Sequence, residues 1–155
     1  MIVVIRVNEV IWVIKVIEVI WVANFCSMSG ISYSGGFREL EVGKEARKFR
    51  NTMSSLTRKF PASEKYKLTD QLLRASRSVT ACIAEGYGRY HFQENVQFCR
   101  QSRGSLMECL DHLTVALDEQ YIDQTRFEEY ESQYQTILKL LNGYISFLTK
   151  RKQQQ

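Results

Sequence analysis

Apolar residues recur at alternating steps of three and four positions along four segments of the chain, a spacing that is typical of amphipathic helices. The first segment begins near Phe37 and ends before Pro61, because proline disfavours the helical conformation at the residue before it. Its apolar stripe comprises Val42, Ala46, Phe49, Met53, Leu56 and Phe60. We expect this stripe to face a core that the other three segments share.

The second segment follows Ser63, which is placed to cap a helix. Its inward positions are Leu68, Leu72, Ala75, Val79, Ile83 and Gly86. The glycines of Gly86-Tyr87-Gly88 predict a turn that ends this helix, with the left-handed conformation that is common at such a point. Gly86 also permits close approach of a neighbouring helix.

The third and fourth segments complete the pattern. The third helix is expected from about Phe92 to Leu117, with inward positions Phe92, Val96, Cys99, Leu106, Cys109, Leu110, Leu113 and Leu117. Asp123 is a candidate cap for the fourth helix, whose apolar positions are Phe127, Tyr130, Tyr134, Ile137, Leu141, Tyr144 and Leu148. Together the four segments predict an all-α, antiparallel up-and-down four-helix bundle over residues 37–150, followed by a basic and polar tail at 151–155.

Residues 1–36 do not follow this pattern, and we interpret them as an N-terminal extension and linker outside the fold. Val, Ile and Trp dominate the first 23 positions, but Arg6, Glu9, Lys15 and Glu18 place charges throughout, which argues against a transmembrane helix. A signal peptide is also disfavoured, since Lys15 interrupts the apolar run. We hypothesise that residues 1–27 are translated upstream sequence and that Met28 is the natural start.

Charge is distributed unevenly along the 155 residues, which carry a formal net charge of +4. Residues 38–103 contain 14 Lys and Arg against 7 Asp and Glu, whereas residues 104–149 contain 2 against 8. The first two helices are therefore basic, and the last two are mainly acidic. Such polarity can attract phosphates or orient subunits against one another, and both interpretations remain open.

The basic half contains a candidate nucleic-acid-binding face. Cations and aromatic rings lie together on and after the second helix, where they could neutralise phosphates and stack on unpaired bases. The candidate residues are Lys67, Arg74, Arg77, Arg89, Arg100, Tyr87 and Tyr90. The alternative is an ordinary solvated face with tyrosines packed at a helix junction.

Other residues in this region are given structural roles. Gly86 and Gly88 form the expected turn, and Arg103 falls close to the inward face of the third helix, where it needs a carboxylate or a path to solvent. We expect Glu85, or else Glu108, to supply that carboxylate.

Candidates for catalysis and metal binding are weak. A single carboxylate such as Glu85 has no matched partner for acid and base chemistry. Glu108 and His112 are one helical turn apart, but a di-iron bundle requires ligands from several helices. The four cysteines lack C-x-x-C spacing. We therefore expect no enzyme, metal, cofactor or disulfide.

Four motifs, in order, resemble the four-helix-bundle family encoded in bacterial 23S rRNA intervening sequences. They are Phe37-Arg38-Glu39-Leu40-Glu41-Val42, Leu68-Thr69-Asp70-Gln71-Leu72 with Arg74-Ala75, Ile83-Ala84-Glu85-Gly86-Tyr87-Gly88-Arg89, and Arg103-Gly104-Ser105-Leu106 with Glu108. The resemblance covers about residues 37–149. It implies an antiparallel four-helix bundle, homopentameric rings and a role in binding RNA or other nucleic acid. The accessory variability determinant of diversity-generating retroelements is similar at greater distance.

The chain departs from the family pattern at two places. Gly43 stands where the family usually has tryptophan, which predicts a packing gap near the start of the first helix. Val79-Thr80-Ala81-Cys82 replaces a proline-containing segment, so a kink expected in the second helix is removed.

Our functional expectation is a cytoplasmic, self-assembling, non-enzymatic bundle that binds nucleic acid, with RNA favoured over DNA. The main alternative is a protein-interaction adaptor whose cationic face meets acidic side chains. Neither interpretation involves a membrane.

Overall fold

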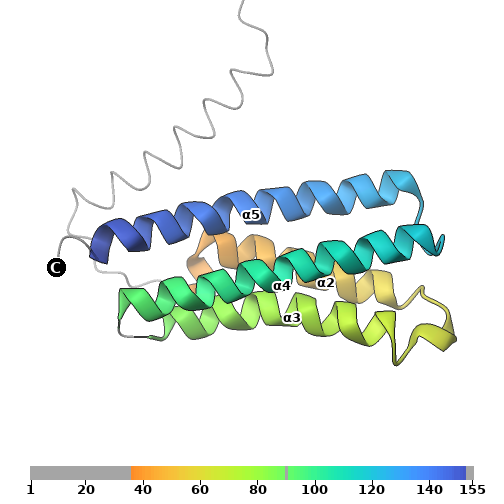
Figure 1. The fold of residues 1–155 in the computed structure, drawn as a ribbon, viewed down its shortest axis with the longest axis horizontal. Helices are drawn as coiled ribbons and strands as arrows, with labels where there is room; N and C mark the ends of the chain where they lie inside the picture. The colour runs from red at the N-terminus through yellow and green to blue at the C-terminus, as the bar shows by residue number, and fades with distance from the viewer. Residues whose placement is uncertain (1–35, 90, 153–155) are drawn as a thin grey trace, which may run out of the picture. The chain divides into compact units, whose positions relative to one another are not determined.

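The computed structural model describes residues 36–89 and 91–152, so the expectations for residues 1–35 lie outside the described ranges. The elements are η1 (Phe37–Glu39), α2 (Glu41–Thr57), η2 (Ala62–Glu64), α3 (Leu68–Tyr87), α4 (Phe92–Asp118) and α5 (Gln124–Lys152). These ranges contain helices and no strands, and the four long helices run up and down as an antiparallel bundle (Figure 1). The predicted fold class is confirmed.

Each long helix packs against two others. Helices α2 and α4 both contact α3 and α5, which makes α2 and α4 opposite corners of the bundle. The start of α2, the α3–α4 turn and the end of α5 lie at one end of the bundle, while the α2–α3 and α4–α5 connections lie at the other end (Figure 1). The basic N-terminal part of α2 is therefore far from the acidic α4–α5 connection.

The periodicity identified the core correctly. All six predicted apolar positions of the first helix and all six of the second are buried. In α4, the predicted Phe92, Leu110 and Leu117 are partly buried against the core, while Asn95 and Ser102 are fully buried although they are polar. Their side chains bond across the bundle. Asn95 Nδ2 donates to the hydroxyl of Tyr144 at 3.2 Å, and Ser102 Oγ donates to the carbonyl oxygen of Val79 at 2.9 Å.

The helix starts confirm one predicted cap and correct the other. Asp123 Oδ1 accepts the backbone N–H of Arg126 at 2.8 Å, as expected for a cap of α5. Ser63 lies instead in η2, and helix α3 begins at Leu68, whose backbone N–H donates to Glu64 Oε2 at 3.3 Å. The Ser63 prediction is wrong because the chain forms a 3-10 turn after Pro61 before α3 begins.

The prediction of a left-handed Gly86 is also wrong. Helix α3 continues through Gly86 to Tyr87, and Gly88 follows with a right-handed φ of −76°. Gly86 is buried at the contact with α4, where an added Cβ would lie 2.8 Å from Cβ of Phe98 and 2.8 Å from Oδ1 of Asn95. Close packing of α3 against α4 therefore requires the glycine, which agrees with the prediction that Gly86 permits close approach of a neighbouring helix.

Candidate nucleic-acid interface

The predicted nucleic-acid-binding residues do not form one surface. Lys67 precedes α3 and Arg89 follows it, and a helix of 20 residues separates such positions by about 30 Å. Arg74 and Arg77 are exposed on the intervening part of α3, where Arg74 Nη1 lies 3.8 Å from Asp70 Oδ2. Tyr90 lies outside the described residues.

Arg89 contacts protein groups at the end of α3. Its Nη2 donates to Glu85 Oε1 at 2.6 Å, and its guanidinium carbon lies 4.9 Å from the ring centroid of Phe98 on α4. Tyr87, in the last turn of α3, is half-buried. A phosphate that reached Arg89 would therefore compete with the carboxylate of Glu85.

The expected ion pair between Glu85 and Arg103 is wrong. Arg103 is exposed and its Nη1 donates to Oδ1 of Asn142 on α5 at 3.1 Å. Glu85 is exposed on α3 and pairs with Arg89. Helix α3 contacts a side of α4 other than the side that α5 contacts, so Glu85 is separated from Arg103. Arg100 precedes Arg103 by three residues and is also exposed, so it shares the α5 side of α4 and is separated from the cations of α3.

The structure brings together a different set of cations, in a hollow between η1, α2 and α3. The hollow has a volume of about 310 Å³. We call it the basic hollow, and its lining residues are Phe37, Arg38, Gly43, Lys44, Arg47, Lys48, Arg50, Asn51, Thr80 and Ile83. Five of these ten residues are cations, and none of the described residues that line it is acidic.

The arginines of the basic hollow are less neutralised than its lysines. Lys44 lies 3.4 Å from Glu41 Oε2 and 3.8 Å from Glu39 Oε2. Lys48 bonds to Glu45 at 2.5 Å, and this bond raises the pKa of Lys48 above its ordinary value. Three of the five cations, the arginines, have no ion pair with any carboxylate in the described residues.

The local contacts place two of these arginines against neutral groups. Arg50 Nη1 donates to Oγ1 of Thr80 on α3 at 3.3 Å, so its guanidinium bridges the two helices. The guanidinium carbon of Arg38 lies 5.9 Å from the ring centroid of Phe37.

Gly43 lies on the wall of the hollow where η1 meets α2. A Cβ at this position would lie 2.9 Å from the carbonyl oxygen of Phe37, so glycine allows η1 to fold back onto α2. The packing gap predicted at Gly43 is thus closed by η1 at the glycine itself, and the hollow lies beside it. Sequence reasoning still missed the site itself, because its cations come from η1 and α2 and converge only when η1 turns at Leu40 and α2 pairs with α3. The available signal was the placement of Gly43, Arg47 and Arg50 at four- and three-residue steps, on one side of a helix.

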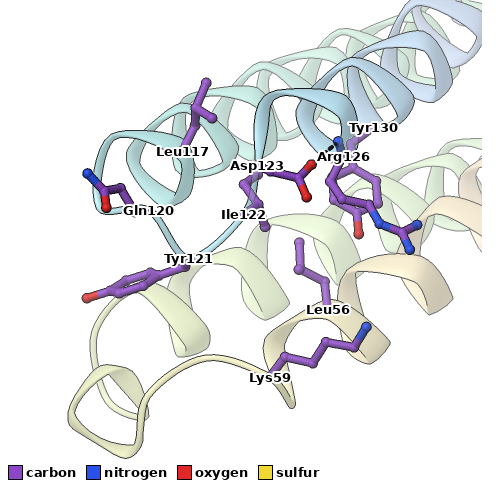
Figure 2. Close-up of a pocket in the computed structure, with 9 residues that line it drawn as sticks. All are labelled: Leu56, Lys59, Leu117, Gln120, Tyr121, Ile122, Asp123, Arg126 and Tyr130. Atoms are coloured by element: carbon purple, nitrogen blue, oxygen red, sulfur yellow. Dashed lines mark hydrogen bonds between the residues drawn. The ribbon is translucent and has the colours of Figure 1, made fainter.

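A second hollow of about 610 Å³ lies beside the α4–α5 connection (Figure 2). It combines cations with an anion and apolar groups: Leu56, Lys59, Leu117, Gln120, Tyr121, Ile122, Asp123, Arg126 and Tyr130. Figure 2 shows the carboxylate of Asp123 bonded at the start of α5, and Arg126 is paired with Glu129 at 2.9 Å. Arg126 is therefore already paired, and the carboxylate of Asp123 lies beside the cations, so this hollow is less suited to phosphate than the basic hollow.

Groups suited to catalysis or metal binding are sparse in the described part of the chain. No cluster of three or more His, Cys, Asp or Glu residues that could hold a metal occurs among residues 36–89 and 91–152. Glu108 Oε1 and His112 Nε2 lie 3.6 Å apart as an isolated pair. Burial raises the pKa of Cys99 to about 11 and of Cys109 to about 12, so both thiols stay protonated at neutral pH. No described helix is long and apolar enough to cross a membrane.

Comparisons with known proteins agree with the bundle. Residues 38–143 match the family model of the 23S rRNA-intervening sequence protein. Among solved structures, the chain is similar to a protein of unknown function from the S23 ribosomal protein family of Bacteroides thetaiotaomicron, with 20% identity and a TM-score of 0.64. This similarity covers 68% of the present chain and 95% of the other chain, and at this identity it shows the fold alone. Curated proteins give no match.

Proposed function

Since the chain belongs to the family of 23S rRNA-intervening sequence proteins, we propose that it is a non-enzymatic helical bundle that binds RNA through the basic hollow and the adjacent cations of α2 and α3. One observation carries this proposal: five cationic side chains surround a hollow whose described lining includes no carboxylate. Clustered arginine and lysine side chains neutralise phosphates and release condensed counterions, and this release drives most of the affinity for nucleic acid.

The geometry favours RNA over an acidic protein partner at this site. The exposed Phe37 offers an aromatic plane next to the cations, and single-stranded nucleic acids use such planes for base stacking. The cations of α3, Arg74 and Arg77, extend the positive surface beyond Arg50 and Thr80. An acidic peptide could pair with the cations of the hollow, but its carboxylates would gain little binding energy from the ring of Phe37.

The test compares variants that remove equal charge from different surfaces. The hollow variant is Arg47→Gln, Lys48→Gln and Arg50→Gln. The control variant carries Arg58→Gln, Lys59→Gln and Lys65→Gln on the exposed α2–α3 connection. The two variants lower the net charge of the protein by the same amount, so its general attraction to a polyanion falls equally in both. Only the hollow variant changes residues of the basic hollow.

We expect the hollow variant to lose at least about tenfold in affinity for single-stranded RNA at about 0.1 M salt, with a salt slope reduced by about 2. The control variant should lose much less, and Arg74→Gln with Arg77→Gln should give an intermediate loss. Equal losses in the two triple variants would reduce the proposal to non-specific attraction. An absence of RNA binding by the parent protein at low salt would favour the adaptor alternative, in which the same cations meet acidic side chains.

We also propose that the protein assembles, with the five-subunit ring that the family resemblance implies. The support is the charge polarity: acidic residues gather around the α4–α5 connection, and basic residues gather around the start of α2. Contacts between unlike surfaces can close a ring of copies. Light scattering on residues 28–155 at micromolar concentration tests this, and a monomer mass throughout that range would contradict it.

A further inference from the structure

We infer that the basic hollow takes one unpaired RNA nucleotide, with its phosphate between Arg47 and Arg50 and its base against the ring of Phe37. This inference rests on the proposed function and adds the form of RNA that the site selects. It depends on three properties of the hollow: its size, its aromatic rim and the polar groups that line it.

The size suits a single nucleotide. A volume of about 310 Å³ lies at the lower end of sites that enclose small molecules, whereas a duplex would need an open surface. The hollow lies between two helices and the short η1, so only a group that projects from the RNA can enter it. Bases of unpaired nucleotides project in this way, since stacking within a helix no longer holds them.

The rim supplies a plane for the base. Phe37 is 38% exposed, although most large apolar side chains of the described bundle are covered. Its ring is not needed in the core, since it lies outside the buried residues and its segment contributes none of them. The guanidinium of Arg38 lies over one face of the ring, 5.9 Å from its centroid, so a base would stack on the other face and Arg38 could approach its phosphate.

The walls of the hollow supply polar groups from one side of α2 and from α3. Arg50 is held by Thr80, which orients its guanidinium without using a carboxylate. Arg47 is exposed one turn earlier on the same side of α2, so the two guanidinium groups can contact one phosphate together. Asn51 lies one helical turn after Arg47 and also lines the hollow, where its exposed amide can bond to a base edge or a ribose hydroxyl.

The experiment uses the full chain, a 12-nucleotide single-stranded RNA that carries one 2-aminopurine, and a duplex of the same sequence. We expect the parent protein to bind the single strand at least about tenfold more tightly than the duplex and to quench the 2-aminopurine fluorescence, because stacking quenches it. Phe37→Leu keeps an apolar side chain but removes the aromatic plane. It should lower single-strand affinity about tenfold and remove the quenching. The matched control is Tyr66→Leu, which removes an aromatic ring that is 82% exposed on the α2–α3 connection and should change neither property.

A second variant, Gly43→Trp, closes the hollow without changing the charge, because its indole occupies the space and its Cβ, which would lie 2.9 Å from the carbonyl oxygen of Phe37, displaces η1. It should reduce single-strand binding while the circular dichroism of the four long helices is retained. If Phe37→Leu and Gly43→Trp both bind as the parent does while the Arg47, Lys48 and Arg50 variant does not, RNA binding stands and the nucleotide site is overturned. If the parent binds no RNA, both proposals fail. Binding of free AMP by a parent protein that binds no RNA would overturn the RNA site in favour of a soluble nucleotide.

Discussion

Gly86 of α3 faces Phe98 of α4 at so short a distance that a Cβ on the glycine would lie 2.8 Å from Cβ of the phenylalanine. Real side chains do not approach so closely, so even alanine must push the two helices apart. We expect Gly86→Ala to lower the free energy of unfolding by about 1–3 kcal/mol, and Gly86→Val to lower it further. Urea unfolding followed by circular dichroism measures both values.

The control for this prediction is Gly104→Ala on the exposed face of α4, where an added Cβ meets no atom within 4 Å. Since glycine in a helix interior is less favourable than alanine, this variant should be stabilised by about 0.5–1 kcal/mol. If Gly86→Ala is stabilised to the same extent, the α3–α4 contact is looser than described.

Gln120 provides a second test, because it is the described non-glycine residue with positive φ, at 59°. The N–H of Tyr121, the next residue, donates to the carbonyl oxygen of Ala116 at 2.8 Å. This bond is typical of a helix C-terminus that ends with a left-handed residue, and that residue is usually glycine. Gln120→Gly should therefore stabilise the protein by about 1 kcal/mol. The same change at Gln101, which is exposed within α4, should destabilise by about 1 kcal/mol, so thermal unfolding of the two variants should move in opposite directions.

The buried thiols predict a loss of stability in alkali. Burial, together with Glu108, raises the pKa of Cys109 from 9.0 to about 12, and burial, together with Cys82, raises that of Cys99 to about 11. Above pH 9 the unfolded thiols release protons that the folded thiols retain, so the free energy of unfolding falls as pH rises from about 9 toward these values. We expect a loss of about 1 kcal/mol per thiol between pH 8 and pH 10.

Urea unfolding at pH 8 and pH 10 checks this slope. A variant with Cys99→Ala and Cys109→Ala should show a shallower decrease, although it starts from a lower stability. Ser76→Ala removes a buried group that does not titrate, and it should keep the slope of the parent protein. An unchanged slope in the double cysteine variant would show that other groups, such as the tyrosines, cause the alkaline loss.

The helices and their inward faces could be predicted from the sequence because the 3.6-residue repeat fixes which positions are buried. The repeat does not state on which side each neighbouring helix lies. Arg103 illustrates the difference: the repeat places it beside the inward face of α4, but only the arrangement of the bundle decides that its exposed side chain meets Asn142 of α5 and not Glu85 of α3.

The candidate site was only partly predictable for a related reason. Gly43 indicated a gap, and the charge count indicated a basic half, but spacing in the sequence relates cations to one another only within one helix. The hollow forms where η1 folds back at Leu40, whose extended ψ of 128° turns the chain just before α2. Hydrophobic periodicity does not predict a local backbone conformation of this kind. The proximity of Arg38 and Arg47 to one hollow is therefore seen only in the structure.

The arrangement of neighbours has a consequence for how the bundle opens. Three of its four lateral contacts join helices that follow one another in the chain, but α2 and α5 meet only after two further helices have been placed between them. Closing this seam orders the longest stretch of chain, so we expect it to form last and to separate first in local fluctuations. Most residues of the basic hollow belong to α2, and the others include Thr80 and Ile83 of α3. A ligand in the hollow would therefore hold α2 against α3 and slow amide hydrogen exchange along the α2–α5 contact, although it touches no residue of α5.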